Sequence, residues 1–251
     1  MSAPPRVAQR LRSAPDGKVR VVHHGRHATY VAIGGWAVGL VSASGVAVPC
    51  ALRSRNRDLG SVPAESAYVR QGVLHLDGRP LVVGRILADV GVRRLDPEGI
   101  ARRAASSAAS QAVPSASVTG LVVPPGLTDR PMAARVGGLV GRGDGLTPAG
   151  DDLLCGWLAT HRAAGVATPD VDRAIRSHLP RTTLLSATLL DCALHGESVP
   201  EFLAFLDALG TSEEDAATRA LYAVGHSSGV ALAQGARLAL SALRNQIGSV
   251  A

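Results

Sequence analysis

Residues 28–85 carry short apolar runs separated by turn residues, a pattern typical of β-strands. The runs are 28–33, 36–41, 46–52, 67–70, 73–76 and 81–83. Asp77-Gly78 predicts a hairpin between the last two runs, because both residues tolerate positive φ. Six short strands with tight turns predict a small β-barrel or sandwich.

The hydrophobic period becomes helical after about residue 95, where Asp96-Pro97 is a typical helix start. Predicted helices cover 100–112, 131–139, 151–164, 170–179, 183–194, 199–209, 212–224 and 229–243. Residues 113–127 are rich in Pro, Ser and Gly and predict a connection. Ser198 with Glu201, and Thr211 with Glu214, have capping-box spacing. The second half therefore predicts an antiparallel helical array.

These patterns predict an α+β chain in three parts. Residues 1–18 are Pro-, Arg- and Ser-rich and are expected to be disordered. Residues 19–92 are expected to form the small β-domain, and residues 93–251 an α-helical domain.

Residues 28–48 lack charge and have about the length of a membrane-spanning helix. Gly34-Gly35, Gly39 and Gly45 interrupt the segment, and its Val, Ile, Tyr and Trp residues favour strands. A buried β-meander is therefore expected, with no membrane partner. The three cysteines lie far apart and fit buried thiols in a reducing cytoplasm.

The formal net charge is +6, but it is unevenly distributed. Residues 1–110 contain 16 Lys and Arg against 7 Asp and Glu, whereas residues 111–251 contain 10 against 13. A basic half is compatible with an acidic partner, although Lys18 is the only lysine and a compositional bias explains the excess equally well. An aromatic content of 3% argues against nucleic acid as a partner.

The segment 141–152 is the strongest candidate for chemistry. Gly141, Gly143 and Gly145 alternate, and Thr147-Pro148 then predicts a helix start. Alternating glycines let backbone N–H groups approach a ligand, and a helix N-terminus adds positive potential. Together they predict an anion cradle, although the spacing matches neither a Walker loop nor a dinucleotide fingerprint.

Asp151 and Asp152 follow the glycines and would repel a bound anion. Three interpretations remain open. The pair could bind Mg²⁺ that bridges to the ligand, accept N–H groups of a ureido or amide substrate, or complement the helix dipole.

Two further polar clusters precede helices. Thr182-Thr183, with Ser186 one turn later, is either a helix cap or part of a site. In the second cluster, 225–229, His226 is either a surface residue or a general base beside Ser227 and Ser228. Three such helix starts in one domain could converge on one site.

The run Gly-Leu-Thr-Pro-Ala-Gly-Asp-Asp at 145–152 resembles a bacterial family that includes a subunit of oxamate carbamoyltransferase, from anaerobic allantoin breakdown. The usual family pattern is Gly-Pro-Gly-Leu-Thr-Pro-Ser-Gly-Asp-Asp, so Asp144 and Ala149 depart from it. The resemblance continues at Thr182-Thr183 with Ser186 and at 226–229, and more loosely in the strands from about residue 25.

The resemblance implies phosphorolysis of oxalurate to oxamate and carbamoyl phosphate, or the reverse, in a hetero-oligomer with other subunits. It implies a small-molecule substrate and, at most, Mg²⁺ as a cofactor, on Asp151 and Asp152. The expected catalytic residues are Asp151, Asp152 and His226, and the expected substrate-binding residues are Gly141, Arg142, Gly143, Gly145, Thr147, Gly150, Thr182, Thr183, Ser227 and Ser228. Two other functions stay open: a non-catalytic module that docks onto an acidic partner, and a stand-alone metal-dependent hydrolase or lyase.

Overall fold

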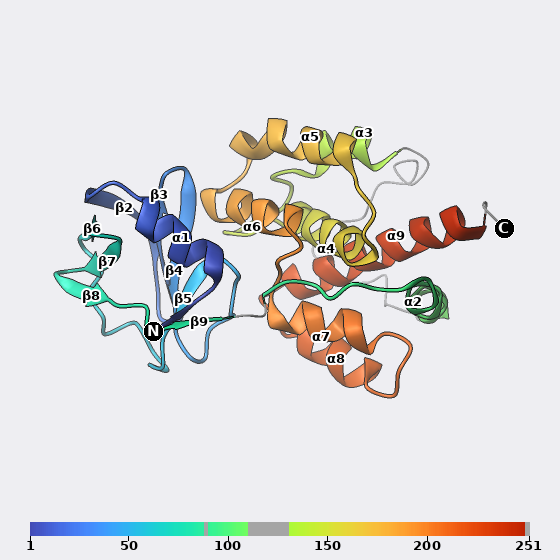
Figure 1. Ribbon diagram of the computed structural model, residues 1–251, viewed down its shortest axis with the longest axis horizontal. Helices are drawn as coiled ribbons and strands as arrows, with labels where there is room; N and C mark the ends of the chain where they lie inside the picture. The colour runs from blue at the N-terminus through green and yellow to red at the C-terminus, as the bar shows by residue number, and fades with distance from the viewer. Residues whose placement is uncertain (88–89, 110–130, 249–251) are drawn as a thin grey trace. The chain divides into compact units, whose positions relative to one another are not determined.

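A computed structural model describes residues 1–87, 90–109 and 131–248. The chain divides into two compact units, Met1–Val90 and Gly91–Ala251. The first contains one curled sheet and the second is helical (Figure 1). The α+β class predicted from the sequence is therefore confirmed.

The first unit is built on a nine-stranded sheet in the order β8-β7-β6-β2-β3-β4-β5-β1-β9. The strands are β1 Ser2–Ala3, β2 Gly17–His24, β3 Ala28–Ile33, β4 Trp36–Val41, β5 Ala51–Arg53, β6 Ala67–Arg70, β7 Val73–Leu76, β8 Arg79–Leu81 and β9 Arg85–Ile86. Most neighbours are antiparallel, while β5 runs parallel to β4 and β9 parallel to β1.

Two of the tight hairpin turns lie where the sequence predicts them. Gly34 and Gly35 connect β3 to β4 with φ of 55° and 74°, and Asp77 and Gly78 connect β7 to β8 with φ of 43° and 78°. Positive φ at both central residues matches the right-handed twist of the paired strands. The segment 28–41 is thus a buried hairpin, but the meander expected for 28–48 is wrong, because the next strand, β5, begins at Ala51 and runs parallel to β4.

The expectation of a disordered segment at 1–18 is wrong. Ser2–Ala3 forms β1, and Pro5–Ser13 forms helix α1. The helix is amphipathic, and Val7, Ala8 and Leu11 on its apolar face are buried. Three arginines and three prolines within residues 1–18 concealed that stripe in the composition, although the 3–4 residue spacing was present.

Other strands differ from the sequence in their bounds. The predicted strand 46–52 shrinks to β5, and the predicted strand 81–83 begins earlier, as β8. Strand β2, which includes His23 and His24, and the short strands β1 and β9 were not among the predicted strands.

The second unit contains α2 Pro97–Ala109, α3 Met132–Leu139, α4 Ala149–Ala164, α5 Pro169–His178, the short 3-10 helix η1 Leu179–Arg181, α6 Leu184–Leu194, α7 Pro200–Ala208, α8 Glu214–Tyr222 and α9 Ser228–Gly248. All eight predicted helices correspond to one of these elements. The connection expected at 113–127 and the end expected for the first helix lie outside the described residues.

The two capping boxes do not form as predicted. Helix α7 has Val199 at its N-cap without a side-chain cap, because Pro200 with its preset φ takes the first helical position. Helix α8 begins at Glu214, whose Oε2 accepts a hydrogen bond from the Gly210 N–H at 2.8 Å.

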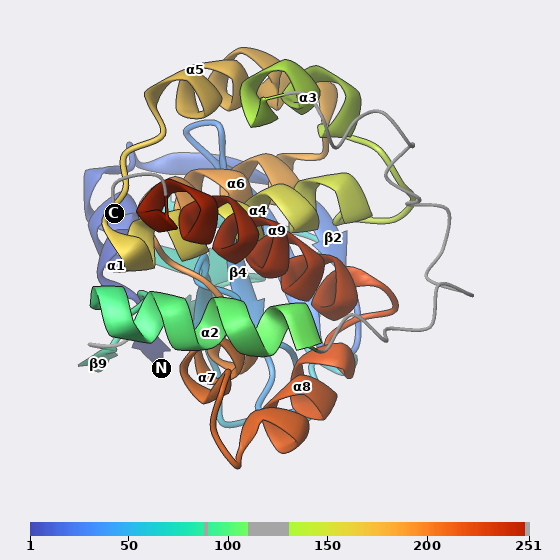
Figure 2. The same ribbon diagram turned by 90° about the vertical axis from the view of Figure 1, so that its right-hand side faces the viewer.

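Helix α4 is the centre of the helical unit, and nearly all of its residues are buried. It packs against α9 and α6 (Figures 1 and 2). A Cβ on Gly156 would lie 2.1 Å from the Leu232 carbonyl oxygen, and one on Gly235 would lie 2.0 Å from that of Leu153. Each helix therefore uses a glycine to admit the backbone of the other, which places the N-terminal end of α4 close to the start of α9.

Within the described ranges, no helix is long and apolar enough to cross a membrane. Cys50, Cys155 and Cys192 are buried thiols that form no disulfide, as the sequence predicts.

Candidate functional site

The three polar segments singled out in the sequence meet around the N-terminus of α4. The loop before this helix folds back on itself, because the Gly150 N–H donates to the Arg142 carbonyl at 2.9 Å. A Cβ on Gly150 would lie 2.1 Å from the Leu139 carbonyl oxygen, and one on Gly141 would lie 2.5 Å from that of Arg181. These two glycines allow backbone segments to pack closely.

Asp151 joins two of the segments. Its side chain is completely buried. One carboxylate oxygen accepts the Gly141 N–H at 2.9 Å, and the other accepts the hydroxyls of Thr182 at 2.5 Å and Ser186 at 2.7 Å. Burial raises the pKa of Asp151, and the three hydrogen bonds oppose that rise. The carboxylate thus holds the glycine loop against the start of α6.

The arrangement around Asp151 does not fit a magnesium site. Both of its oxygens already accept hydrogen bonds, and Mg²⁺ requires near-octahedral oxygen coordination with several waters. Among the residues that the structure describes, no group of three or more His, Cys, Asp or Glu side chains could hold a metal ion. We therefore assign no metal to Asp151 and Asp152.

Asp152 has a different environment although it is the next residue. It is 5% exposed, and its Oδ2 atom is buried without a hydrogen-bond partner. Burial raises the pKa of Asp152 to about 7, with a smaller contribution from the charge of Asp151, while a hydrogen bond from Ser228 opposes the rise. This carboxyl therefore exchanges a proton near neutral pH.

Ser228 connects Asp152 to the loop. Its hydroxyl lies 3.0 Å from that of Thr147, so a hydrogen-bonded chain runs from Thr147 through Ser228 to the buried carboxyl. Gly229 makes this position possible, because a Cβ there would lie 1.7 Å from the Leu221 carbonyl oxygen. The start of α9 is thereby packed directly on the end of α8.

The exposed part of the loop carries free backbone donors. The N–H groups of residues 143–147 make no hydrogen bond within the described part of the chain, and residues 142–146 are exposed. Gly143 and Gly145 have φ of 118° and 86°, a region that other residues rarely adopt. The N–H groups of Gly141 and Gly150, by contrast, are already used inside the protein.

Thr183 has two structural tasks. Its hydroxyl caps α6 by accepting the Ser186 N–H at 3.0 Å, and it donates to the Leu146 carbonyl at 2.6 Å. The helix-cap interpretation is therefore confirmed for Thr183, and the same hydroxyl fixes the glycine loop. His226 is exposed and Ser227 half-buried, and neither takes part in the hydrogen bonds that connect the three segments.

Ser186 and Cys155 are the neighbours of the carboxylates that the candidate residues omitted. Ser186 was visible only as a hydroxyl one turn after Thr183. Cys155 lies on α4 one turn after Asp152, and burial raises the pKa of its thiol, with smaller contributions from Asp152 and Asp151. The i, i+3 spacing from Asp152 is the signal that could have identified this contact.

The site combines a buried, titratable carboxyl that has hydroxyl partners with a neighbouring loop that offers free backbone N–H donors. This combination is typical of sites that bind or transform small polar molecules. Residues 139–240 match the model of a protein family described as oxamate carbamoyltransferase subunit AllH. This match supports the family expected from the 145–152 motif.

The matched range contains all three polar segments. The looser resemblance of the N-terminal strands falls outside it. No curated protein and no solved structure matches the chain.

Proposed function

We propose that this chain is a subunit of a carbamoyltransferase-like enzyme that acts on a small ureido or amido acid such as oxalurate or oxamate. The observation that carries the proposal is the family match over residues 139–240, which spans the site at the N-terminus of α4. The name of the family also supports assembly with other kinds of subunit.

The hydrogen-bonded chain from Thr147 to Asp152 supplies the proton transfer. In phosphorolysis, a phosphate oxygen bonds to the ureido carbonyl carbon, the bond from that carbon to the oxamate nitrogen breaks, and this nitrogen gains the proton that phosphate loses. A carboxyl with a pKa of about 7 can accept and return that proton at neutral pH. Ser228 and Thr147 would carry it, because Asp152 itself is almost inaccessible.

The glycine loop supplies the anion contacts. The unused N–H groups of residues 143–147 would hydrogen-bond phosphate or carbamoyl phosphate, and the exposed Arg142 guanidinium would pair with its charge. Asp144 lies in the same loop, where the related pattern has proline. Its negative charge would weaken phosphate binding, so Asp144→Pro is expected to lower the KM for phosphate.

The test is carbamoyl phosphate formation from oxalurate and phosphate, measured with the chain alone and with its partner subunits. Asp152→Asn, Ser228→Ala and Thr147→Val should each lower kcat at least tenfold, because each interrupts the proton path. Asp215→Asn removes an exposed carboxylate on α8 and serves as the matched control.

Either of two results would sink this proposal: no activity in the complete assembly, or Asp152→Asn and Asp215→Asn with equal kcat. A non-catalytic module that docks onto an acidic partner would give the first result and would also release that partner at high salt. A stand-alone metal-dependent enzyme would instead lose activity with a chelator, an outcome that the environment of Asp151 does not favour.

A further inference from the structure

A cavity lies among α3, α4, α5 and α9, with a volume of about 670 Å³. A volume of this size is typical of small-molecule sites. Its wall is mainly apolar, with Met132, Val171, Leu238 and Ala242 among the lining residues. None of the residues of the proposed carbamoyl site lines it.

Arg135 is the charged residue that makes this cavity unusual. The side chain is 6% exposed, and its Nε and Nη2 atoms are buried without a hydrogen-bond partner. Burial lowers the pKa of the guanidinium, which nevertheless stays charged in proteins. A buried charge without a partner is strongly destabilising, so such a group is normally paired.

Asp170 is the acidic residue on the same wall, but it belongs to another pair. Its Oδ1 accepts Arg173 Nη1 at 3.0 Å, and both side chains are about three-quarters exposed. The unpaired atoms of Arg135 therefore require a partner that the described chain does not supply.

Trp157 and His161 form the aromatic part of the same wall. Their rings are in contact, with centroids 3.7 Å apart and planes tilted by 31°. The Nδ1 atom of His161 lies 3.0 Å from the Trp157 carbonyl oxygen, and because a carbonyl only accepts, Nδ1 carries the proton. Burial lowers the pKa of His161, so the ring is neutral and Nε2 is an acceptor. This wall can pack against a flat apolar group.

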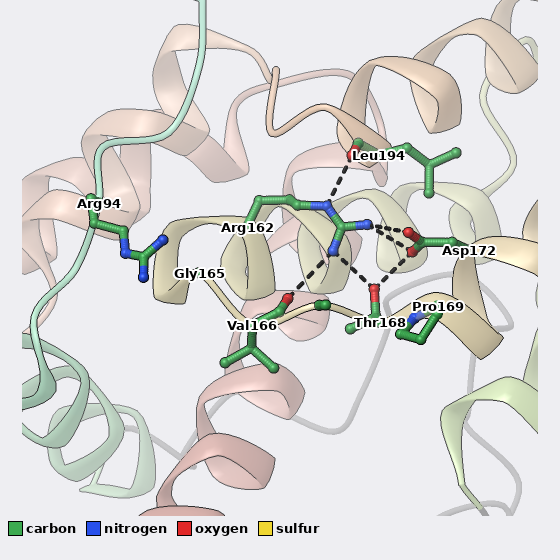
Figure 3. A pocket seen from close by; sticks show the side chains of 9 residues that line it. Arg94, Arg162, Gly165, Val166, Thr168, Pro169, Asp172 and Leu194 are labelled. Atoms are coloured by element: carbon green, nitrogen blue, oxygen red, sulfur yellow. Dashed lines mark hydrogen bonds and ion pairs between the residues drawn. The ribbon is translucent and has the colours of Figure 1, made fainter.

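In a neighbouring cavity, all three guanidinium nitrogens of Arg162 have hydrogen-bond partners (Figure 3). Arg162 donates to the carbonyls of Leu194 and Val166, to the Thr168 hydroxyl and to both oxygens of Asp172, at distances of 2.6–3.5 Å. These hydrogen bonds of Arg162 stabilise the fold. Arg135 lines the adjoining cavity, which shares residues 166–169 with this one, and its Nε and Nη2 atoms have no comparable partners.

We propose that the cavity around Arg135, Trp157 and His161 binds a small carboxylic acid with an apolar, flat body. The carboxylate accepts the Nε and Nη2 hydrogens of Arg135 side by side, a geometry that a planar guanidinium matches. The body of the acid packs on the Trp157 and His161 rings and on the aliphatic wall. A phosphate group would find few further donors here, which is why a carboxylate is favoured.

The test uses benzoate as the probe and benzamide as its neutral counterpart. The chain contains two tryptophans, so a Trp36→Phe chain reports binding through Trp157 fluorescence alone. Benzoate should cause a saturable change, and benzamide should bind at least tenfold more weakly. Arg135→Met should weaken benzoate binding at least tenfold, whereas Arg176→Met, which removes an exposed positive charge from α5 that does not line the cavity, should leave it unchanged.

A second measurement, thermal melting, distinguishes a loss of binding in Arg135→Met from a loss of folding. Without ligand, Arg135→Met should melt at a higher temperature than the parent chain, because it removes an uncompensated buried charge. The proposal is overturned by equal affinity for benzoate and benzamide, by no saturable change with benzoate, or by an affinity for benzoate that Arg135→Met leaves intact. None of these outcomes depends on carbamoyl transfer.

Discussion

Asp152→Asn is expected to stabilise the helical unit, by an amount that depends on pH. Asp152 is 5% exposed and has an unpaired buried oxygen, so its charged form is poorly solvated in the folded protein. Asparagine has nearly the same shape, keeps an acceptor for Ser228, and carries no charge. The substitution therefore isolates the free energy of ionising this one carboxyl.

The size follows from the pKa values. Burial raises the pKa of Asp152 from 3.8 to about 7, and at 1.36 kcal/mol per unit the folded state gives up about 4 kcal/mol when the group ionises fully. The folded state holds the proton more tightly than the unfolded state, so stability is greatest below pH 4 and falls as pH rises to about 7. Between pH 5 and pH 8 the loss from this group is about 2.5 kcal/mol.

The assay is urea unfolding at pH 5, 6, 7 and 8, followed by Trp157 fluorescence in a Trp36→Phe chain. Titration of all other groups is common to both proteins, so the advantage of Asp152→Asn over its parent should grow by about 2.5 kcal/mol across this range. The exposed Asp215→Asn should show no such growth. Parallel stability curves for Asp152→Asn and its parent would refute the reasoning about burial.

Two further predictions concern the framework of the site, both measured by urea unfolding. Asp151→Asn should cost about 3 kcal/mol because it leaves buried donors unpaired, and Ser186→Ala about 1 kcal/mol because it removes one of them; equal costs would contradict the central role of Asp151. Gly235→Ala should cost about 3 kcal/mol or more, since its Cβ would lie 2.0 Å from the Leu153 carbonyl oxygen. Gly138→Ala meets nothing within 4 Å on α3 and should be neutral or stabilising by up to about 1 kcal/mol; the idea of a close helix crossing fails if both alanines behave alike.

The two proposed sites share a physical feature. Asp152 and Arg135 are both buried ionisable groups with polar atoms that lack partners. Such groups lower stability and are commonly found where a ligand or reaction uses them. Asp151 and Arg162 are also largely buried, but their hydrogen bonds are complete, and we assign them to the fold. The two pairs of residues therefore differ in whether their buried polar atoms have hydrogen-bond partners, and not in burial itself.

Local signals predicted most of the elements. The hairpins at Gly34-Gly35 and Asp77-Gly78 need positive φ, which few residue types tolerate, so the sequence indicates them directly. The helices follow from the 3.6-residue period and from Gly and Pro at their ends. Helix α1 was missed because its apolar stripe is only three residues wide within a basic, Pro-rich segment. The 46–52 strand was overestimated because an apolar run need not be paired along its whole length.

The sequence predicted which segments form the site, but not the role of each residue in it. Glycine spacing and polar helix starts identified 141–152, 182–186 and 226–229, all of which lie around or near the start of α4. The sequence could not distinguish Asp151 from Asp152, which are adjacent and chemically identical. Their side chains leave the helix about 100° apart, so one reaches the donors of Gly141, Thr182 and Ser186, and the other reaches Ser228.

The sequence by itself determined most of the helices, the hairpin turns and the family resemblance over the motif, because these depend on residues close together in the chain. Only the tertiary structure decided which buried charge is paired. The partners of Asp151 lie 10 to 35 positions away, and Arg135 meets Trp157 and His161 only after α3 packs beside α4. Burial and pairing are properties of packed helices, so no local pattern could report them.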